Sequence, residues 1–225
     1  MSAVKGAAGV RDTRARLIDV AERLFAEYGI EAVSLRMVGT EAGQRNNSAV
    51  LYHFGSKDGL IAAIIDVRSA PVDARRAELA AALRAGGGPP DPAELIGLLL
   101  QPLVETIGAT GERTWYLRFL ANVMDHPMFE APWRPDASRP PGAPARPDPP
   151  AMRHLRVEWR RLLPDLPDAE FERRTRWTMI AAFRLLADYE RQRSAAPAAA
   201  PPAGQVVADL TRMLLALMQA PHPAP

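Results

Sequence analysis

The stretch Gly43-Gln-Arg-Asn-Asn-Ser-Ala-Val-Leu-Tyr-His-Phe-Gly-Ser-Lys-Asp58 decides how this 225-residue chain is organised. Gly43 suits the positive φ of a tight turn between two helices. Val50 and Phe54 lie four residues apart on one face of a short helix, so we expect both in the core. Gly55 ends that helix and Ser56 caps the next. A helix presented to a DNA groove requires this arrangement.

Two more helices are predicted upstream of this stretch. Thr13 is placed to N-cap a helix whose apolar residues recur at spacings of three and four until Gly29. Ser34 is the next N-cap, and the short helix after it runs to about Glu41. The first 55 residues therefore hold three short helices, with a helix-turn-helix at about 34–54.

Downstream of Ser56 the apolar pattern predicts helices and no strands. A connecting helix runs to Pro71, and a second helix covers 72–83. Further helices are predicted over 91–108, 112–125, 152–163, 168–192 and 204–219. Residues 132–150 hold eight prolines without periodicity and indicate a flexible or polyproline-like loop. The predicted fold class is all-α, with a helix-turn-helix domain at 11–71 and a second helical domain at 72–220.

Composition limits the possible functions. The chain has no Cys, which excludes disulfides, thiolate metal sites and a cysteine nucleophile. Its histidines lack ligand spacing, so we expect no metal and no other cofactor. The N-terminus lacks the apolar core of a signal peptide, and charged or polar residues interrupt the apolar run at 95–107. We therefore expect a cytoplasmic protein without a membrane span. The net charge of +2 barely argues for nucleic acid, so that case depends on where the charges lie.

Polar side chains gather around the predicted turn and short helix. The residues from Gln44 to Ser48 offer donors and acceptors for base edges or phosphates at a helix N-terminus. Tyr52 and His53 follow on the later turn, and Lys57 lies in the first turn of the next helix, where an anion is favoured. The predicted DNA-binding residues are Ser34, Arg36, Gln44, Arg45, Asn46, Asn47, Ser48, Tyr52, His53 and Lys57.

Residues 15–63 resemble the DNA-binding domain of the tetracycline-repressor (TetR) family. The matching motifs are Ala21-Glu-x-Leu-Phe-Ala-x-x-Gly29, Ser34-Leu-Arg-Met-Val38, Ala42-Gly43 and Tyr52-His-Phe-Gly-Ser-Lys-Asp-Gly-Leu60. The resemblance implies a homodimeric, ligand-responsive transcriptional regulator, usually a repressor, with a variable helical C-terminal domain. Two features depart from the pattern. Aligned on Phe54, Leu51 stands where many members carry a phosphate-contacting Tyr, and the segment from Gly43 to Phe54 is one residue longer.

The second domain is expected to bind an effector and to form the dimer. Aromatic residues spread over three of its helices suit an apolar pocket with few polar groups, although ordinary core packing is the alternative for each of them. The predicted pocket residues are Trp115, Phe119, Asn122, Trp159, Trp177 and Phe183. The last helix has too much apolar surface for a monomer. The predicted dimer residues, on the last two long helices, are Phe171, Leu185, Tyr189, Leu210, Leu214 and Leu217.

The function predicted is that of a regulator and not of an enzyme. It binds a palindromic site in double-stranded DNA as a homodimer and, as a repressor, is released by a small apolar effector. Two alternatives stay open. An all-helical enzyme would use the pocket, but the chain lacks a paired acid and base at a recognisable spacing. A dimeric adaptor that has lost DNA binding is favoured slightly by Leu51.

Overall fold

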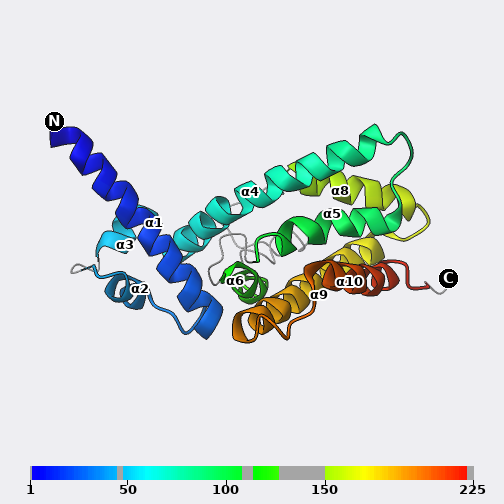
Figure 1. Ribbon diagram of the computed structural model, residues 1–225. Helices are drawn as coiled ribbons and strands as arrows, with labels where there is room; N and C mark the ends of the chain where they lie inside the picture. Colours follow the sequence, from blue (N-terminus) through cyan, green and yellow to red (C-terminus); the bar gives the residue numbers. More distant parts are fainter. Residues whose placement is uncertain (1, 45–47, 108–113, 127–149, 222–225) are drawn as a thin grey trace. The chain divides into compact units, whose positions relative to one another are not determined.

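The chain forms two compact units, Met1–Ser69 and Ala70–Pro225. The computed structural model describes residues 2–44, 48–107, 114–126 and 150–221. Over these residues every regular element is an α-helix, which confirms the predicted all-α fold (Figure 1). None of the described helices is both long and apolar enough to cross a membrane. The helices are α1 (Ser2–Tyr28), α2 (Leu35–Glu41), α3 (Ser48–Phe54), α4 (Lys57–Ala85), α5 (Pro92–Val104), α6 (Tyr116–Val123), α8 (Pro150–Leu162), α9 (Asp168–Ala195) and α10 (Ala203–Met218).

The first unit packs α1, α2, α3 and the start of α4 around one core. Helix α2 contacts both α1 and α3. Phe25, Val38, Val50 and Leu60 are fully buried and come from all four helices, as their helical spacing predicts. Phe54, expected beside Val50 in the core, is half-buried. The core therefore holds α3 by its inner face and leaves its outer face in solvent.

Short-range signals fix the helix ends of this unit. The Ser34 hydroxyl accepts a hydrogen bond from the Met37 N–H at 3.2 Å, which confirms the predicted N-cap. Gly43 has a φ of 72°, the left-handed conformation that the turn between α2 and α3 requires. At the next corner, a Cβ on Gly59 would lie 2.0 Å from the Phe54 carbonyl oxygen. Glycine at 59 is therefore what lets α3 and α4 meet so closely, a requirement that the sequence pattern did not reveal.

Two helices run further than predicted. Helix α1 begins at Ser2 and not at Thr13, and the added turns contain several Ala, the strongest helix former. Helix α4 is unbroken over Lys57–Ala85, so the helix predicted at 72–83 is its continuation through Pro71. Pro71 has no N–H to give to the carbonyl of Val67. Val67 is exposed, so water can take that hydrogen bond and the helix tolerates the proline.

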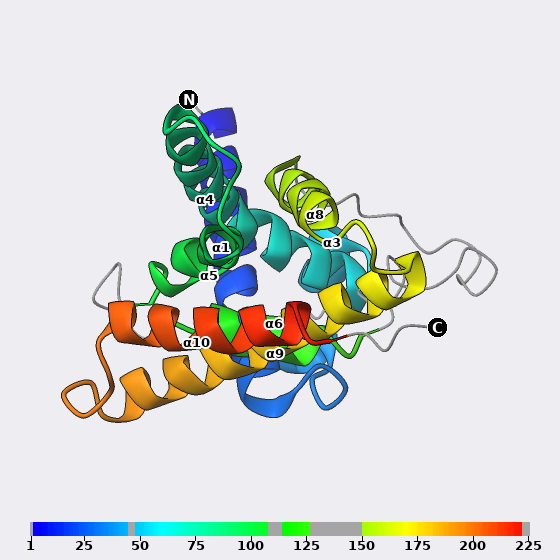
Figure 2. The same ribbon diagram turned by 90° about the vertical axis from the view of Figure 1, so that its right-hand side faces the viewer.

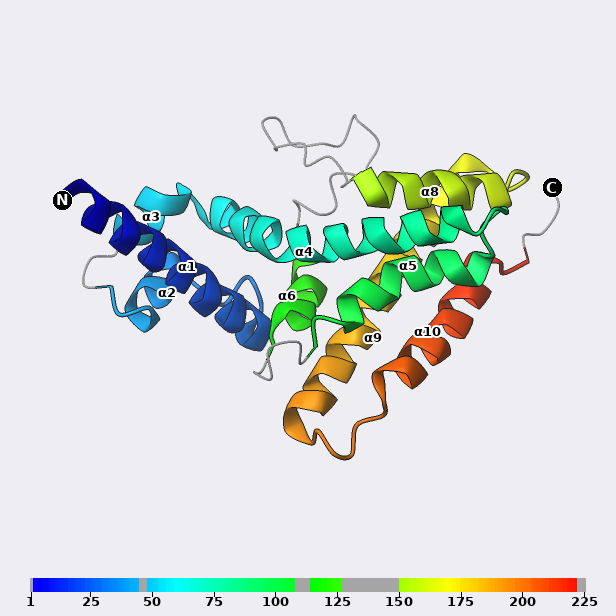
Figure 3. The same ribbon diagram turned by 45° about the horizontal axis from the view of Figure 1, so that its top comes forward.

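The second unit is built around α5, which contacts α8 and α10. Leu95, Leu99, Leu100 and Leu103 bury different sides of α5, so the apolar run predicted as a buried helix is one. Helix α9 packs against α6 and α10, and Figures 2 and 3 show α9 and α10 side by side. Helix α5 ends at Val104, short of the predicted residue 108. Of the predicted Pro-rich loop, residues 132–149 lie outside the described residues.

Buried polar side chains fasten helix ends in the second unit. Glu190 on α9 is fully buried and accepts hydrogen bonds from the N–H groups of Leu117 at 3.3 Å and Arg118 at 3.0 Å, in the first turn of α6. Arg174, also buried, donates to the Met218 carbonyl at 3.1 Å, at the end of α10. These groups have no partner inside their own helix, so a side chain from α9 supplies one.

A third buried contact compensates for a proline. Pro102 lies inside α5 and has no N–H for the carbonyl of Leu98. The buried side chain of Arg76 on α4 donates its Nε–H to that carbonyl at 3.0 Å, and its guanidinium also pairs with Asp73. Burial lowers the pKa of Arg76, against the attraction of Asp73. Pro71 and Pro102 thus each leave one helix carbonyl without its N–H donor. Water can donate to that carbonyl at the surface, and an arginine donates to it in the core.

Candidate nucleic-acid interface and effector site

Helix α3 presents a mixed polar and apolar face to solvent. Tyr52 is 81% exposed and Leu51 is 51% exposed, whereas Val50, on the inner face of α3, is fully buried. The rings of Tyr52 and His53 contact edge to face, with centroids 5.2 Å apart. A phenol, an imidazole and one aliphatic side chain therefore stand together on the outer face.

The predicted DNA-binding residues are in part brought to this face. Ser48, at the start of α3, is exposed, and Lys57 is half-buried at the start of α4. Gln44 is half-buried in the turn. Arg36 on α2 is exposed, as is Ser34, whose hydroxyl is occupied by capping α2. Arg45, Asn46 and Asn47 lie outside the described residues.

Two arginines of α1 border the same face, and the sequence reasoning did not single them out. The guanidinium carbon of Arg14 lies 5.3 Å from the centroid of the Phe54 ring, at the end of α3. The Arg16 guanidinium reaches the turn, because a Cβ on Gly43 would lie 3.5 Å from its Nη2. Both side chains are exposed. No spacing in the sequence relates α1 to α3, so only the packing of the unit reveals them.

Two other cations among the described side chains of the first unit are paired within it. Arg23 pairs with Glu27 at 3.1 Å and with Glu41 at 2.6 Å. Arg68 on α4 pairs with the buried Glu22 of α1 at 2.7 Å and with Asp19 at 2.5 Å. Burial opposes the charge of Arg68, but these two carboxylates outweigh it and raise its pKa. These pairs join helices and leave little charge for a partner.

The cations beside α3 differ. Within residues 12–44 and 48–107, no ion pair is found for Arg14, Arg16, Arg36 or Lys57, which we call the open cations. An uncompensated cation can neutralise a phosphate and release its counterion without first breaking a pair. Among the described side chains of the unit, the open cations thus lie on α1, on α2 and at the start of α4, the helices next to the turn and α3.

Comparison with known proteins agrees with this geometry. Residues 17–64 match the family model of the bacterial regulatory proteins of the tetR family. Residues 17–64 are a TetR-family DNA-binding domain. The match confirms the resemblance found in the sequence and makes α2, the Gly43 turn and α3 the helix-turn-helix of a TetR DNA-binding domain. A search of curated proteins gave no match.

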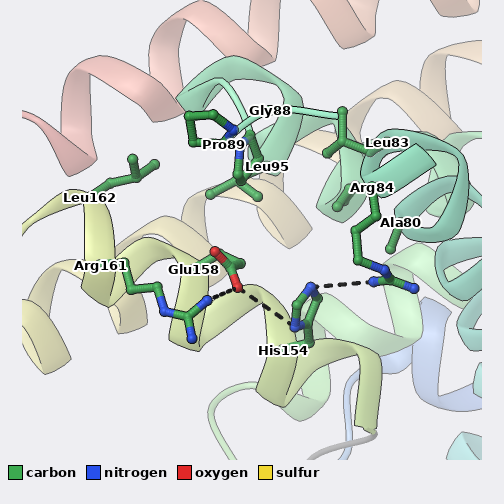
Figure 4. A pocket seen from close by; sticks show the side chains of 12 residues that line it. Ala80, Leu83, Arg84, Gly88, Pro89, Leu95, His154, Glu158, Arg161 and Leu162 are labelled. Carbon is green, nitrogen blue, oxygen red and sulfur yellow. Dashed lines mark hydrogen bonds and ion pairs between the residues drawn. The ribbon is translucent and has the colours of Figure 1, made fainter. Parts of the chain in front are cut away.

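Two cavities lined by described residues of the second unit bear on effector binding. The larger, of about 480 Å³, is lined by the end of α4, the loop at 88–90, α5 and α8 (Figure 4). The smaller, of about 80 Å³, lies between α5, α8, α9 and the end of α10. Small-molecule sites usually measure roughly 300–1,000 Å³. Of these two cavities, the larger has room for an effector.

Neither of these two cavities brings the six predicted pocket residues together. Trp159 lines the smaller cavity, and the other five line neither cavity. Phe119 and Phe183 are buried in the core. Trp115 and Asn122 are half-buried on or beside α6, and Arg118 lies 4.1 Å from the Trp115 ring centroid. Trp177 is 47% exposed on α9. Spacing alone cannot tell a core aromatic from a cavity lining, and core packing accounts for Phe119 and Phe183.

The predicted dimer residues divide in two. Phe171, Tyr189, Leu210 and Leu214 are buried by the second unit of the same chain, so they have little surface left for another copy. Leu185 and Leu217 are half-buried. The large apolar side chains that α9 and α10 do expose are Trp177 and Met213, at 47% and 55%. Helical spacing could have separated the two faces of α10, because Leu210, Leu214 and Met218 repeat every four residues.

Proposed function

We propose that this regulator represses transcription by binding a palindromic operator as a homodimer, and that a small molecule bound to the second unit releases it. The observation that carries the proposal is the group of open cations around the exposed face of α3. In the proposed complex Arg14, Arg16, Tyr52, His53 and Lys57 contact phosphates. The base contacts come from Gln44, Arg45, Asn46, Asn47 and Ser48, with Arg36 and Ser34 at the edge. Phosphate contacts fix the register and base contacts select the sequence.

The proposal is tested by selecting bound sites from random DNA with the purified full-length protein, followed by footprinting. We expect a palindrome whose half-sites lie about 10–10.5 base pairs apart, or a multiple of that spacing. Binding that weakens steeply with salt is expected at every site. Enrichment of no sequence would refute the proposed function and favour the adaptor that has lost DNA binding, for which the exposed Leu51 is the supporting observation.

Dimer formation is proposed through the exposed faces of α9 and α10, with Trp177, Leu185, Met213 and Leu217 in contact with a second copy. A Glu at Met213 should give monomers in sedimentation, because it buries a charge in the proposed contact without touching the core. The matched control is Val157→Glu on α8, since Val157 is also apolar and 48% exposed. A wild-type protein that stays monomeric at micromolar concentration contradicts the dimer.

Release by a ligand requires the two units to be coupled. Helix α4 belongs to both units, since it starts in the first and continues past Ser69 into the second. A ligand lowers operator affinity only by the difference in its own affinity for the DNA-binding and released states. In this proposal the protein works in the cytoplasm. The competing enzyme hypothesis would require turnover of a bound compound.

A further inference from the structure

The larger cavity has an apolar wall and a charged wall. Leu95 and Leu98 of α5 and Ala80 of α4 are buried side chains that line it. Figure 4 shows Pro89 beside Leu95, with the polar residues of α8 across from them. An apolar wall of this kind binds the hydrocarbon part of a ligand, and a few polar groups then fix its orientation.

The charged wall is a chain of four side chains. Arg84 at the end of α4 lies with its Nη1 3.4 Å from Nε2 of His154 on α8. Nδ1 of His154 is 3.9 Å from a carboxylate oxygen of Glu158, which pairs with Arg161 at 2.6 Å. Good hydrogen bonds between such groups measure about 2.7–3.2 Å. The Arg161–Glu158 contact is of that quality, but the two contacts of His154 are longer.

The charges of this wall do not balance. Glu158 is matched by Arg161. For Arg84, the polar contact found among the described residues is the one with His154, which is either neutral or a second cation. A cation in the last turn of α4 is favoured by the helix dipole, which explains a basic residue at 84. The dipole does not explain a guanidinium directed at a histidine of another helix. An anion between the two would give both a partner.

We propose that the larger cavity binds an amphipathic organic anion, a carboxylate carried on an apolar body. The carboxylate binds Arg84 in the bidentate geometry that guanidinium favours, in place of the 3.4 Å contact with His154, and His154 donates to it from the other side. The apolar body lies against Leu95 and Leu98. The regulatory meaning of this site rests on the proposed function, in which its ligand is the effector. The expected effector is therefore acidic at one end and not wholly apolar.

The test is isothermal titration of the full-length protein, without DNA, with ligands that share a body and differ in charge. One set is octanoate, octan-1-ol and octyltrimethylammonium, and a second, aromatic set is 2-naphthoate, 2-naphthol and 2-naphthylmethylammonium. We expect at least one anion to bind ten times more tightly than its neutral counterpart, with the cation weakest. If in both sets the neutral compound binds as tightly as the anion, the proposal is wrong.

Variants place the site. Arg84→Gln should raise the Kd of the preferred anion at least tenfold and leave that of its neutral counterpart within twofold, because only the carboxylate is deprived of its partner. The matched control is Arg212→Gln, an exposed arginine of α10 outside the cavity, which should change neither Kd. Equal effects of the two substitutions, or an equal weakening of anion and neutral compound in Arg84→Gln, would overturn the assignment. Arg84 is exposed, so folding should survive the change.

The same anion is then added to the complex of wild-type protein with its selected operator. Loss of the band shift supports the effector role. If the anion binds as expected but leaves the complex intact, the ligand class stands and release by this ligand fails. If the protein selects no operator at all, the proposed function fails and the titrations still decide what the cavity binds.

Discussion

Arginine has opposite roles in the two units. Around α3 in the first unit, Arg14, Arg16 and Arg36 extend into solvent and, in residues 12–44 and 48–107, have no carboxylate partner. In the second unit Arg76 and Arg174 are buried and donate to backbone carbonyls that their own helices leave vacant. The difference shows that the number of arginines says little about nucleic-acid binding. What matters is whether each charge is already used inside the fold.

The largest expected effect tests the buried side of this comparison. Glu190→Ala removes the carboxylate that pairs with Arg118 at 3.1 Å and caps α6, so it should lower the free energy of unfolding by about 3–5 kcal/mol. All four Trp residues lie within 70–225, so tryptophan fluorescence in denaturant reports on this unit. The control is Asp188→Ala, two residues away on α9, whose exposed pair with Arg191 should contribute less than about 1 kcal/mol. Equal effects would mean that burial of the pair does not matter.

A second prediction concerns the coupling between Arg76 and Pro102. Arg76→Leu should cost about 1–3 kcal/mol, because the buried Leu98 carbonyl loses its donor. Pro102→Ala restores a backbone N–H to that carbonyl, so it should recover part of the loss in the double variant. The unfolding energies of the two single variants and the double variant form a cycle that measures this coupling. If the two effects simply add, Arg76 stabilises the unit in some other way.

For the open cations around α3, a substitution should change DNA binding and leave the free energy of unfolding unchanged. Arg16→Gln should weaken binding to all DNA sequences alike and reduce the slope of log K against log salt by roughly 0.9 for each phosphate that a subunit no longer neutralises. Lys57→Ala should behave in the same way. Arg23→Gln is the control on the same helix, since Arg23 is already paired with Glu27 and Glu41. A slope that falls as much for Arg23 as for Arg16 would contradict the distinction between paired and open cations.

The smallest expected effect concerns the one aliphatic side chain on the outer face of α3. Leu51 cannot donate to a phosphate, and an exposed aliphatic group suits the methyl of a thymine in the major groove. Replacing that thymine by deoxyuridine should cost about 0.8 kcal/mol, the value of one buried CH₂ group. The penalty should vanish in Leu51→Ala. The thymine penalty should persist in Asn46→Ala and Asn47→Ala. At least one of these two variants should instead weaken operator binding by about 1–3 kcal/mol and relax the preference for a different base. A penalty at no thymine of the operator would show that Leu51 faces away from the bases.

The sequence predicted what depends on near neighbours. Ser34 as an N-cap and Gly43 as a turn residue depend on a few adjacent residues, and both are confirmed. The helix end predicted at Pro71 was wrong. The free-energy cost of a proline inside a helix depends on whether the Val67 carbonyl can reach water, which is a property of the folded unit. Arg14 and Arg16 were missed for the same reason, since packing alone brings α1 to the turn. The larger cavity joins α4, α5 and α8, and no spacing within one helix could have indicated it.

The proline in α4 has a mechanical consequence. A helix resists bending because each bend must stretch hydrogen bonds along one side of it, and kinks form where such a bond is missing. The turn from Val67 to Pro71 already lacks one, and it spans the boundary between Ser69 and Ala70. Helix α4 is therefore most compliant at the point where it passes from the DNA-binding unit into the unit with the cavities. Pro71→Ala would therefore stiffen α4 at this boundary without changing any residue of the proposed DNA-binding face or of the larger cavity.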